Sequence, residues 1–467
     1  MKKSLNVFIL IKVVIVISVI ENQKVRKEVD SFGTVEIPNQ FLYGIQTVRA
    51  VQNLSFSGKT LNQYPKYIES LALVKKAAAI TNIETGVIEE SIGSFILQSC
   101  EEIISGRHLD QFPVDILHGG GGIGSNMNIN EVIANIANEL NGGTRGIYSP
   151  IHPNDDVNAS QSTSDVCHTA MRLAVVKQFA RLDLVSRKVQ TTIVEMVDSF
   201  IEITTISRTC LQDAMRIQLG DFISGYAAML SRRHHLLEQS VMELKKVNLG
   251  GTVIGTGTGA SKAYQDLVIH NLSKITGYQL QKRENLIDAA QNIDDLANVS
   301  NQLALLATCL IKMGKDLRLL SSGPEAGFSE IILPSVMAGS SFFPGKVNPV
   351  IPETLIQSCF QVLGCDRVVQ ATLEHGELNL NIFEGAAGAN ILDAMKMLEK
   401  SLILFNEKCL EDIKVNKEKC KEYANSLIPS VVELKEKHGY SVVSKLMKEK
   451  SKNDVKALLH RGGLVID

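Results

Sequence analysis

The chain has 467 residues, more than one hydrophobic core usually supports, so we expect two or three domains. Hydrophobic residues make up 45% and charged residues 21%, as in a soluble globular protein, and the net charge of −2 provides no basic surface for nucleic acid. The eight cysteines form no CxxC pair and no Cys/His cluster with metal-ligand spacing. This pattern predicts reduced thiols, a cytoplasmic protein and no metal site.

An apolar run opens the chain. Leu5–Ile20 follows Lys2 and Lys3, as in a signal peptide or a membrane anchor. However, Lys12 interrupts the run, no small-residue cleavage site follows it, and it is short for a membrane span. We interpret residues 1–22 as a hydrophobic extension ahead of the fold and expect no stable membrane association, with export or membrane tethering as the alternative.

The next segments predict short strands or loops and then helices. Pro38 and Gly44 would break any long helix between residues 24 and 53. From Tyr67 to Ile104, apolar residues recur every three or four positions, as they do in amphipathic helices.

Two polar segments precede predicted helices. Residues 118–135 read HGGGGIGSNMNINEVIAN, a glycine loop whose amides, with the dipole of the following helix, can bind an anion. It is not a nucleotide phosphate loop, because no Gly-Lys-Ser/Thr follows. Residues 152–165 read HPNDDVNASQSTSD, a polar loop with N-cap residues ahead of a helix. Taken alone, each segment is also compatible with an ordinary surface loop.

Helical patterns then dominate from Val166 to about Leu320, and Leu286–Leu320 is mostly free of helix breakers. Helices of this length favour a helical bundle over a sheet.

The densest set of reactive groups lies at residues 339–353, which read GSSFFPGKVNPVIPE. Glycine and proline predict a shaped loop here. Within it a hydroxyl, an ammonium, an amide and a carboxylate group follow one another closely. Such a set can hold a carboxylate and move a proton.

These segments together resemble the aspartase/fumarase superfamily. Residues 339–353 are similar to its G-S-S-x-M-P-x-K-x-N-P signature, and the VIPE ending is closer to aspartases than to fumarases. The block S-N-M-N-x-N-E-V from Ser125, the HPND and SQS elements of residues 152–165 and SRTCLQDAM at residues 207–215 resemble further family motifs. The resemblance is dense from Lys24 to Glu384.

The resemblance implies an all-α subunit with three domains, at residues 23–158, 159–395 and 396–467. The central long-helix bundle would form a twenty-helix core in a homotetramer. Each active site would combine the blocks around Ser162, Thr209 and Ser340 from three different subunits.

The resemblance also implies an anti elimination of an amine from a small amino-acid or dicarboxylate substrate, without a metal or organic cofactor. Ser340 would be the base, activated as an alkoxide in a closing loop, and Lys346 would bind the second carboxylate. The substrate-binding residues implied are Ser162, Thr163, Thr209, Ser341, Asn348, Ser125 and Asn126.

Three positions depart from the aspartase pattern where aspartases contact the amine: Ile123, Ser164 and Cys210. Isoleucine cannot hydrogen-bond, so Ile123 predicts an altered specificity. Glu353 would contact residues of the site without touching the substrate itself. In fumarases this glutamate pairs with a His, and Cys210 replaces that His here. No activating base stands beside Cys210 in sequence, so a nucleophilic cysteine is not expected.

Three functions remain open from the sequence. The first is an ammonia-lyase that converts L-aspartate to fumarate and ammonia. The second is a lyase of the same mechanism with another leaving group, such as a substituted amine, a betaine such as ergothioneine, or water as in a fumarase. The third is a non-catalytic structural relative, against which the retention of Ser340, Lys346 and Asn348 argues.

Overall fold

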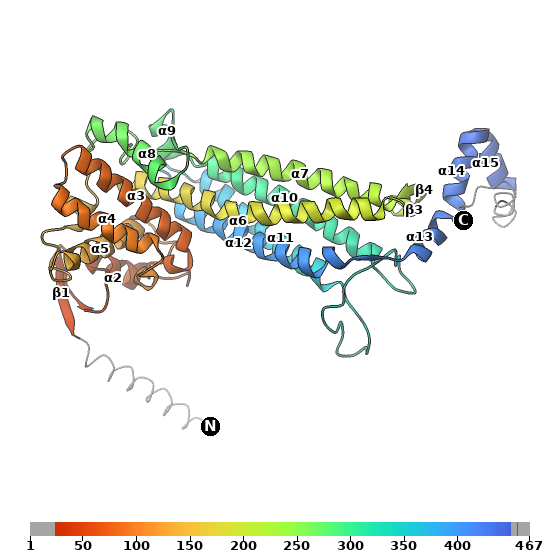
Figure 1. Ribbon diagram of the computed structural model, residues 1–467, viewed down its shortest axis with the longest axis horizontal. Helices are drawn as coiled ribbons and strands as arrows, with labels where there is room; N and C mark the ends of the chain where they lie inside the picture. The colour runs from red at the N-terminus through yellow and green to blue at the C-terminus, as the bar shows by residue number, and fades with distance from the viewer. Residues whose placement is uncertain (1–23, 450–454, 456–467) are drawn as a thin grey trace, which may run out of the picture. The chain divides into compact units, whose positions relative to one another are not determined.

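The computed structural model describes residues 24–449 and residue 455, and these are predominantly helical (Figure 1). The chain divides into two compact units. The first contains the chain up to Phe179 together with Ser240–Ser300 and Asp366–Asp393. The second contains Ala180–Gln239, Asn301–Cys365 and the chain from Ala394 onward. The division expected from the sequence, with boundaries after residues 158 and 395, stays a prediction.

The first unit begins with an antiparallel pair of strands, β1 (Val25–Asp30) and β2 (Gly33–Pro38), with Val25 opposite Pro38. The strands agree with the prediction for this segment. The structure adds a helix that the sequence pattern did not predict, α2 (Ile45–Leu54), which begins directly after Gly44.

The predicted helices between Tyr67 and Ile104 are confirmed as α3 (Pro65–Glu84) and α4 (Glu90–Ile104). Pro65 occupies the first turn of α3, where a missing N–H costs nothing. Together with α5 (Ile123–Leu140), these helices lie side by side in the first unit (Figure 1). The shorter helices α8 (Lys262–Thr276) and α9 (Leu286–Gln291) belong to the same unit, and α8 packs on α3.

Long helices make up most of the remaining chain, as predicted. They are α6 (Thr163–Phe200), α7 (Leu219–Glu243), α10 (Asp294–Leu320), α11 (Val350–Glu374) and α12 (Glu384–Lys408). The helix predicted for Leu286–Leu320 is interrupted between α9 and α10. Asn292 adopts an extended conformation there, and two aspartates open the first turn of α10, where the helix dipole favours negative charge.

A hairpin in the second unit lies within the stretch predicted to be helical. Its strands are β3 (Thr204–Thr209) and β4 (Gln212–Gln218). The β-branched residues at the start of β3 favour a strand over a helix. The connecting residues Cys210 and Leu211 have φ angles of 53° and 61°, a left-handed conformation that costs free energy for residues other than glycine.

Three further elements are small. A parallel pair joins β5 (Lys246–Val247) to β6 (Gln281–Lys282), and an antiparallel pair joins β7 (Ile331–Ile332) to β8 (Lys414–Val415). The described chain ends with α13 (Lys417–Ala424), α14 (Leu427–His438) and α15 (Tyr440–Glu449).

Among the described residues, no helix is both long enough and apolar enough to cross a membrane. The apolar run of residues 1–22, for which an extension was predicted, lies outside the described residues.

Candidate functional site

The first unit brings Asn126 and Thr163 together at the beginning of α6. Asn126 Nδ2 donates hydrogen bonds to Thr163 Oγ1 and to Asn158 Oδ1, both at 3.1 Å. Because Thr163 Oγ1 accepts this bond, its own proton remains available to be donated to a ligand. The arrangement suits a hydroxyl that binds a carboxylate.

Ser162 caps α6, within the segment for which N-cap residues were predicted. Its Oγ accepts from Ser164 N at 3.4 Å, while its own N–H donates to Asp165 Oδ1 at 2.9 Å. Asp165 Oδ2 accepts two further bonds, from the N–H groups of Gly250 and Thr252, both at 3.0 Å. The buried carboxylate therefore ties the N-terminus of α6 to a glycine-rich turn.

The glycine loop ahead of α5 lies against this helix terminus. Gly122 has a φ of 90°, and a Cβ atom there would lie 2.9 Å from Cys167 Sγ. Glycine is therefore required by both backbone conformation and space. Ser125 and Asn126, in the first turn of α5, are buried, whereas the Ile123 side chain is 44% exposed.

His118 stabilises the same loop with two hydrogen bonds, which together define the tautomer of its ring. The backbone carbonyl of Asp115, 2.6 Å away, can only accept, so His118 Nδ1 carries the proton. Its Nε2 is then free to accept from Gly124 N at 2.9 Å. Burial lowers the pKa of His118 below its usual value, which keeps the ring neutral.

The unfolding free energy is expected to depend on pH through His118. As pH falls, the unfolded chain binds the proton first, at the ordinary histidine pKa of about 6.5. The stability that the neutral ring contributes is thus fully present above that pH and is lost as pH falls through the lower folded-state pKa. Urea unfolding of the native protein and of His118→Gln should show the native protein losing stability relative to the variant below about pH 6.5. Parallel profiles would contradict this role.

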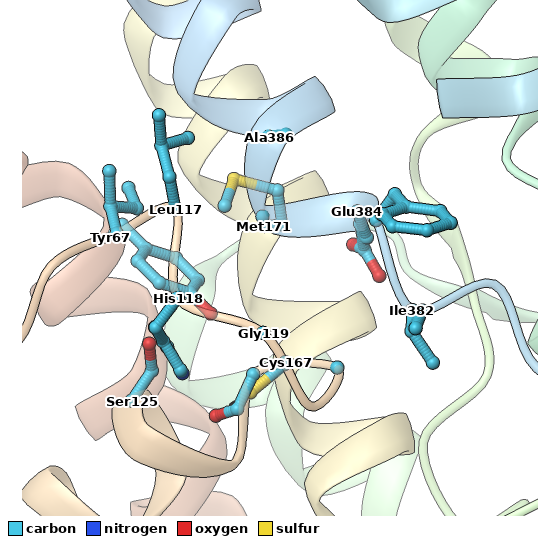
Figure 2. A pocket seen from close by; sticks show the side chains of 15 residues that line it. Tyr67, Leu117, His118, Gly119, Ser125, Cys167, Met171, Ile382, Glu384 and Ala386 are labelled. Carbon is cyan, nitrogen blue, oxygen red and sulfur yellow. Dashed lines mark hydrogen bonds between the residues drawn. The ribbon is translucent and has the colours of Figure 1, made fainter. Parts of the chain in front are cut away.

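A cavity of about 120 Å³ lies behind the glycine loop in the first unit. Figure 2 shows Tyr67 and Ser125 on one side of it and Glu384 on the other. Most of its lining is apolar. Gly121, Gly122, Gly385 and Ala386 have no side chain or only a methyl group, so they do not fill the cavity. Burial raises the pKa of Tyr67 well above its usual value, so its hydroxyl keeps its proton.

An ion cluster fixes the beginning of α12 against α6 within the first unit. Arg172 donates to both carboxylate oxygens of Asp295, at 2.7 and 2.9 Å, and to Glu384 Oε1 at 3.3 Å. His168 Nε2 lies 2.6 Å from Glu384 Oε2. All four side chains are buried.

In the second unit, Ser340 lies in the connection between β7 and α11. Its Oγ accepts the backbone N–H groups of Phe342 and Phe343, at 3.0 and 2.9 Å. Two such donors stabilise a negative charge on that oxygen and favour loss of its proton. A Cβ on Gly339 would lie 2.7 Å from Asn348 N and from Lys346 O, so the loop needs glycine there.

The other predicted residues of this loop differ in their contacts. Lys346 Nζ lies 5.8 Å from the centroid of the Phe343 ring, and no carboxylate of the described residues pairs with it. Asn348 Nδ2 donates to Gly339 O at 2.7 Å, which leaves its second N–H for a ligand. Ser341 is exposed, and Glu353 forms an ion pair with Arg318 at 3.2 Å.

Thr209 and Cys210 lie at the exposed tip of the β3–β4 hairpin. Ser164 lies in the first turn of α6, buried, and its Oγ has no hydrogen-bond partner among the residues that the structure describes. The roles assigned to the site residues from the sequence stay predictions.

Sequence reasoning missed three buried polar residues of the first unit. His118 was noted only as the start of the glycine loop. Arg172 and Lys75 gave no signal, because each lies within a helical pattern and its partners are distant in the chain. No group of three metal-ligating side chains comes together in residues 24–449.

Comparison with known proteins gives several matches. Residues 33–364 match a protein family described as Lyase. The chain is 39% identical to the aspartate ammonia-lyase of a Bacillus species over 428 residues, which cover 92% of this chain and 91% of that protein. It is 37% identical to the aspartate ammonia-lyase of Escherichia coli K12 over 445 residues, which cover 94% and 93% of the two chains.

Two solved structures are also similar. The fumarate lyase:delta crystallin of Brucella melitensis bound to cobalt has a TM-score of 0.89 at 39% identity, covering 95% of this chain and 100% of that chain. The class II fumarase of Schistosoma mansoni has a TM-score of 0.89 at 30% identity, covering 94% and 96%.

Proposed function

Since the chain belongs to the aspartase/fumarase superfamily of lyases, we propose that it is an aspartate ammonia-lyase, which converts L-aspartate to fumarate and ammonia. The observation that carries the proposal is the geometry of Ser340. Its oxygen accepts two backbone N–H groups in a loop whose Lys346 pairs with no carboxylate of the described chain. A base and a cation that can receive a carboxylate are therefore supplied by one loop.

In the proposed reaction, the Ser340 alkoxide removes a proton from the carbon beside one carboxylate. That carboxylate takes up the electron pair as an aci-carboxylate, held by the hydroxyls of Ser162, Thr163 and Ser341. Collapse of this intermediate expels the amine from the neighbouring carbon, and the double bond of fumarate forms. Lys346, Asn348 and Thr209 hold the second carboxylate, and Ser125 and Asn126 support the first.

The proposed site residues come from both compact units, since Ser162 belongs to the first and Thr209 and Ser340 belong to the second. We propose a homotetramer in which each active site combines the blocks around Ser162, Thr209 and Ser340 from three copies. We place it in the cytoplasm, where its eight free thiols stay reduced.

The experiment that tests the proposal is an absorbance assay for fumarate with the purified protein. L-aspartate should be turned over and D-aspartate should not, because a chiral site that holds both carboxylates accepts the amine on one side only. L-malate serves as the control for a fumarase-type hydration. A correctly assembled protein that releases fumarate from L-malate but not from L-aspartate would contradict the proposal.

A second candidate, a lyase for substituted amines, is favoured by the cavity behind the glycine loop. A cavity of about 150 Å³ can hold a benzene molecule, so 120 Å³ suits a small ring or a methylated ammonium group. Release of amine from N-substituted aspartates or betaines would support this candidate. Ala386→Val, which narrows the cavity, should then reduce activity on the substituted compounds more than on L-aspartate.

A further inference from the structure

Lys75 is a buried cation that the proposed reaction does not use. It lies on α3 in the first unit with none of its surface exposed. Its Nζ donates to Asn158 Oδ1 at 2.8 Å, and no carboxylate of the described chain lies within ion-pair distance. Burying an ammonium group without a paired carboxylate costs considerable free energy, so a specific role must offset that cost.

The contacts of Asn158 connect Lys75 to the predicted carboxylate site. Asn158 Oδ1 accepts from Lys75 and also from Asn126 Nδ2, at 3.1 Å. The same Asn126 Nδ2 donates to Thr163 Oγ1 at 3.1 Å. Lys75 thus polarises the carbonyl that orients Asn126, and Asn126 in turn fixes Thr163 as a hydroxyl that donates its proton outward.

The charge of Lys75 also matters at this end of α6. Asp165, three residues after Ser162, brings a buried carboxylate close to the place where an anionic substrate is expected. Burial raises the pKa of Asp165, and backbone hydrogen bonds and the ammonium group of Lys75 oppose that rise. Without Lys75, the negative charge of Asp165 would oppose the binding of a second anion.

We propose that Lys75 is a positioning residue that sets the affinity of the Thr163 site for a dicarboxylate, by orienting Asn158 and Asn126 and by supplying positive charge beneath the site. The inference rests on the proposed function only in that Thr163 receives a substrate carboxylate. Lys75 itself touches no reacting atom.

The protonation of Lys75 should make this affinity depend on pH. Burial lowers the pKa of Lys75 to about 7, and the titratable groups that face it, which oppose this shift, are Cys167 and Asp165 on α6 and Cys100 on α4. Below that pH the ammonium is charged and favours an anion. As pH rises through about 7, the charge is lost and binding weakens.

Binding of succinate, a dicarboxylate with no amine to eliminate, tests the inference without turnover. By isothermal titration calorimetry, the dissociation constant for the native protein should rise about tenfold between pH 6 and pH 8.5. A tenfold change corresponds to a difference of about one unit in the pKa of Lys75 between the bound and the free protein. Lys75→Met should bind succinate weakly at both pH values. For L-aspartate, the variant should raise KM more than it lowers kcat.

The adjacent lysine provides a matched control. Lys76 forms a surface ion pair with Glu101, and Lys76→Met should keep the native pH profile. Burial raises the pKa of Glu131 to about 7, so Glu131 titrates in the same pH range. Both variants retain Glu131. The difference between their binding profiles therefore reports the titration of Lys75 alone.

Three outcomes would overturn the inference: a flat profile for the native protein, a native profile preserved in Lys75→Met, or no succinate binding by the native protein at any pH. The first and third need no variant, so they decide the question even if Lys75→Met does not fold. Normal succinate profiles without turnover of L-aspartate would contradict the proposed function and leave the role of Lys75 intact.

Discussion

We expect Ser340→Ala to lower the elimination rate by a factor of about 10²–10⁴, the contribution that a positioned general base typically makes. Alanine lacks the oxygen that accepts the N–H groups of Phe342 and Phe343, so no alkoxide can form. Because the carbon acid beside a carboxylate is weak, water cannot replace this base efficiently. The loss should appear in kcat, since Lys346 and Asn348 remain to bind substrate. Steady-state kinetics with fumarate absorbance measures it.

Ser335→Ala is the matched control for this experiment, because Ser335 is an exposed serine of the same connection between β7 and α11. This variant should retain the native kcat. A Ser340→Ala protein with native kcat, or equal losses in both variants, would remove Ser340 from the role of base.

The largest effect on stability is expected for Arg172→Leu. Leucine removes the bidentate partner of Asp295, which keeps only Arg283, and one partner of Glu384, and both carboxylates would remain buried. Breaking a buried ion pair from one side typically costs about 3–5 kcal/mol. Urea unfolding at a fixed protein concentration should therefore show a marked decrease in the free energy of unfolding.

Arg181→Leu provides the comparison on the same helix. Arg181 is 68% exposed and pairs with Glu399 at 3.1 Å, so its loss should cost clearly less than the loss of the fully buried Arg172. If the two variants were equally stable, the buried cluster would not stabilise the first unit in the way described.

The parts of the fold that depend on local signals were predictable. The periodicity between Tyr67 and Ile104 predicted α3 and α4, and the polar segment before α6 predicted N-cap residues there. The β3–β4 hairpin was missed because its strands are short and amphipathic patterns surround them. The break before α10 was missed because it contains neither glycine nor proline, and backbone conformation at Asn292 interrupts the helix instead.

The site residues, too, were predictable only where the signal is local. The composition of residues 339–353 predicted a turn-rich loop that carries a serine. The two donors to Ser340 are backbone N–H groups, which the residue types do not reveal. Lys75 and Asn158 are 83 residues apart, and Arg172 and Glu384 are 212 apart. Such pairings arise from packing between segments that are distant in the chain, and no local pattern of the sequence encodes them.

The turn at Cys210 has a practical consequence. Of the eight cysteines, it alone is exposed, since the others are buried or half-buried. A thiol-reactive fluorophore should therefore label the hairpin tip selectively in the separated chain. Its emission would then report directly whether assembly or substrate covers that tip.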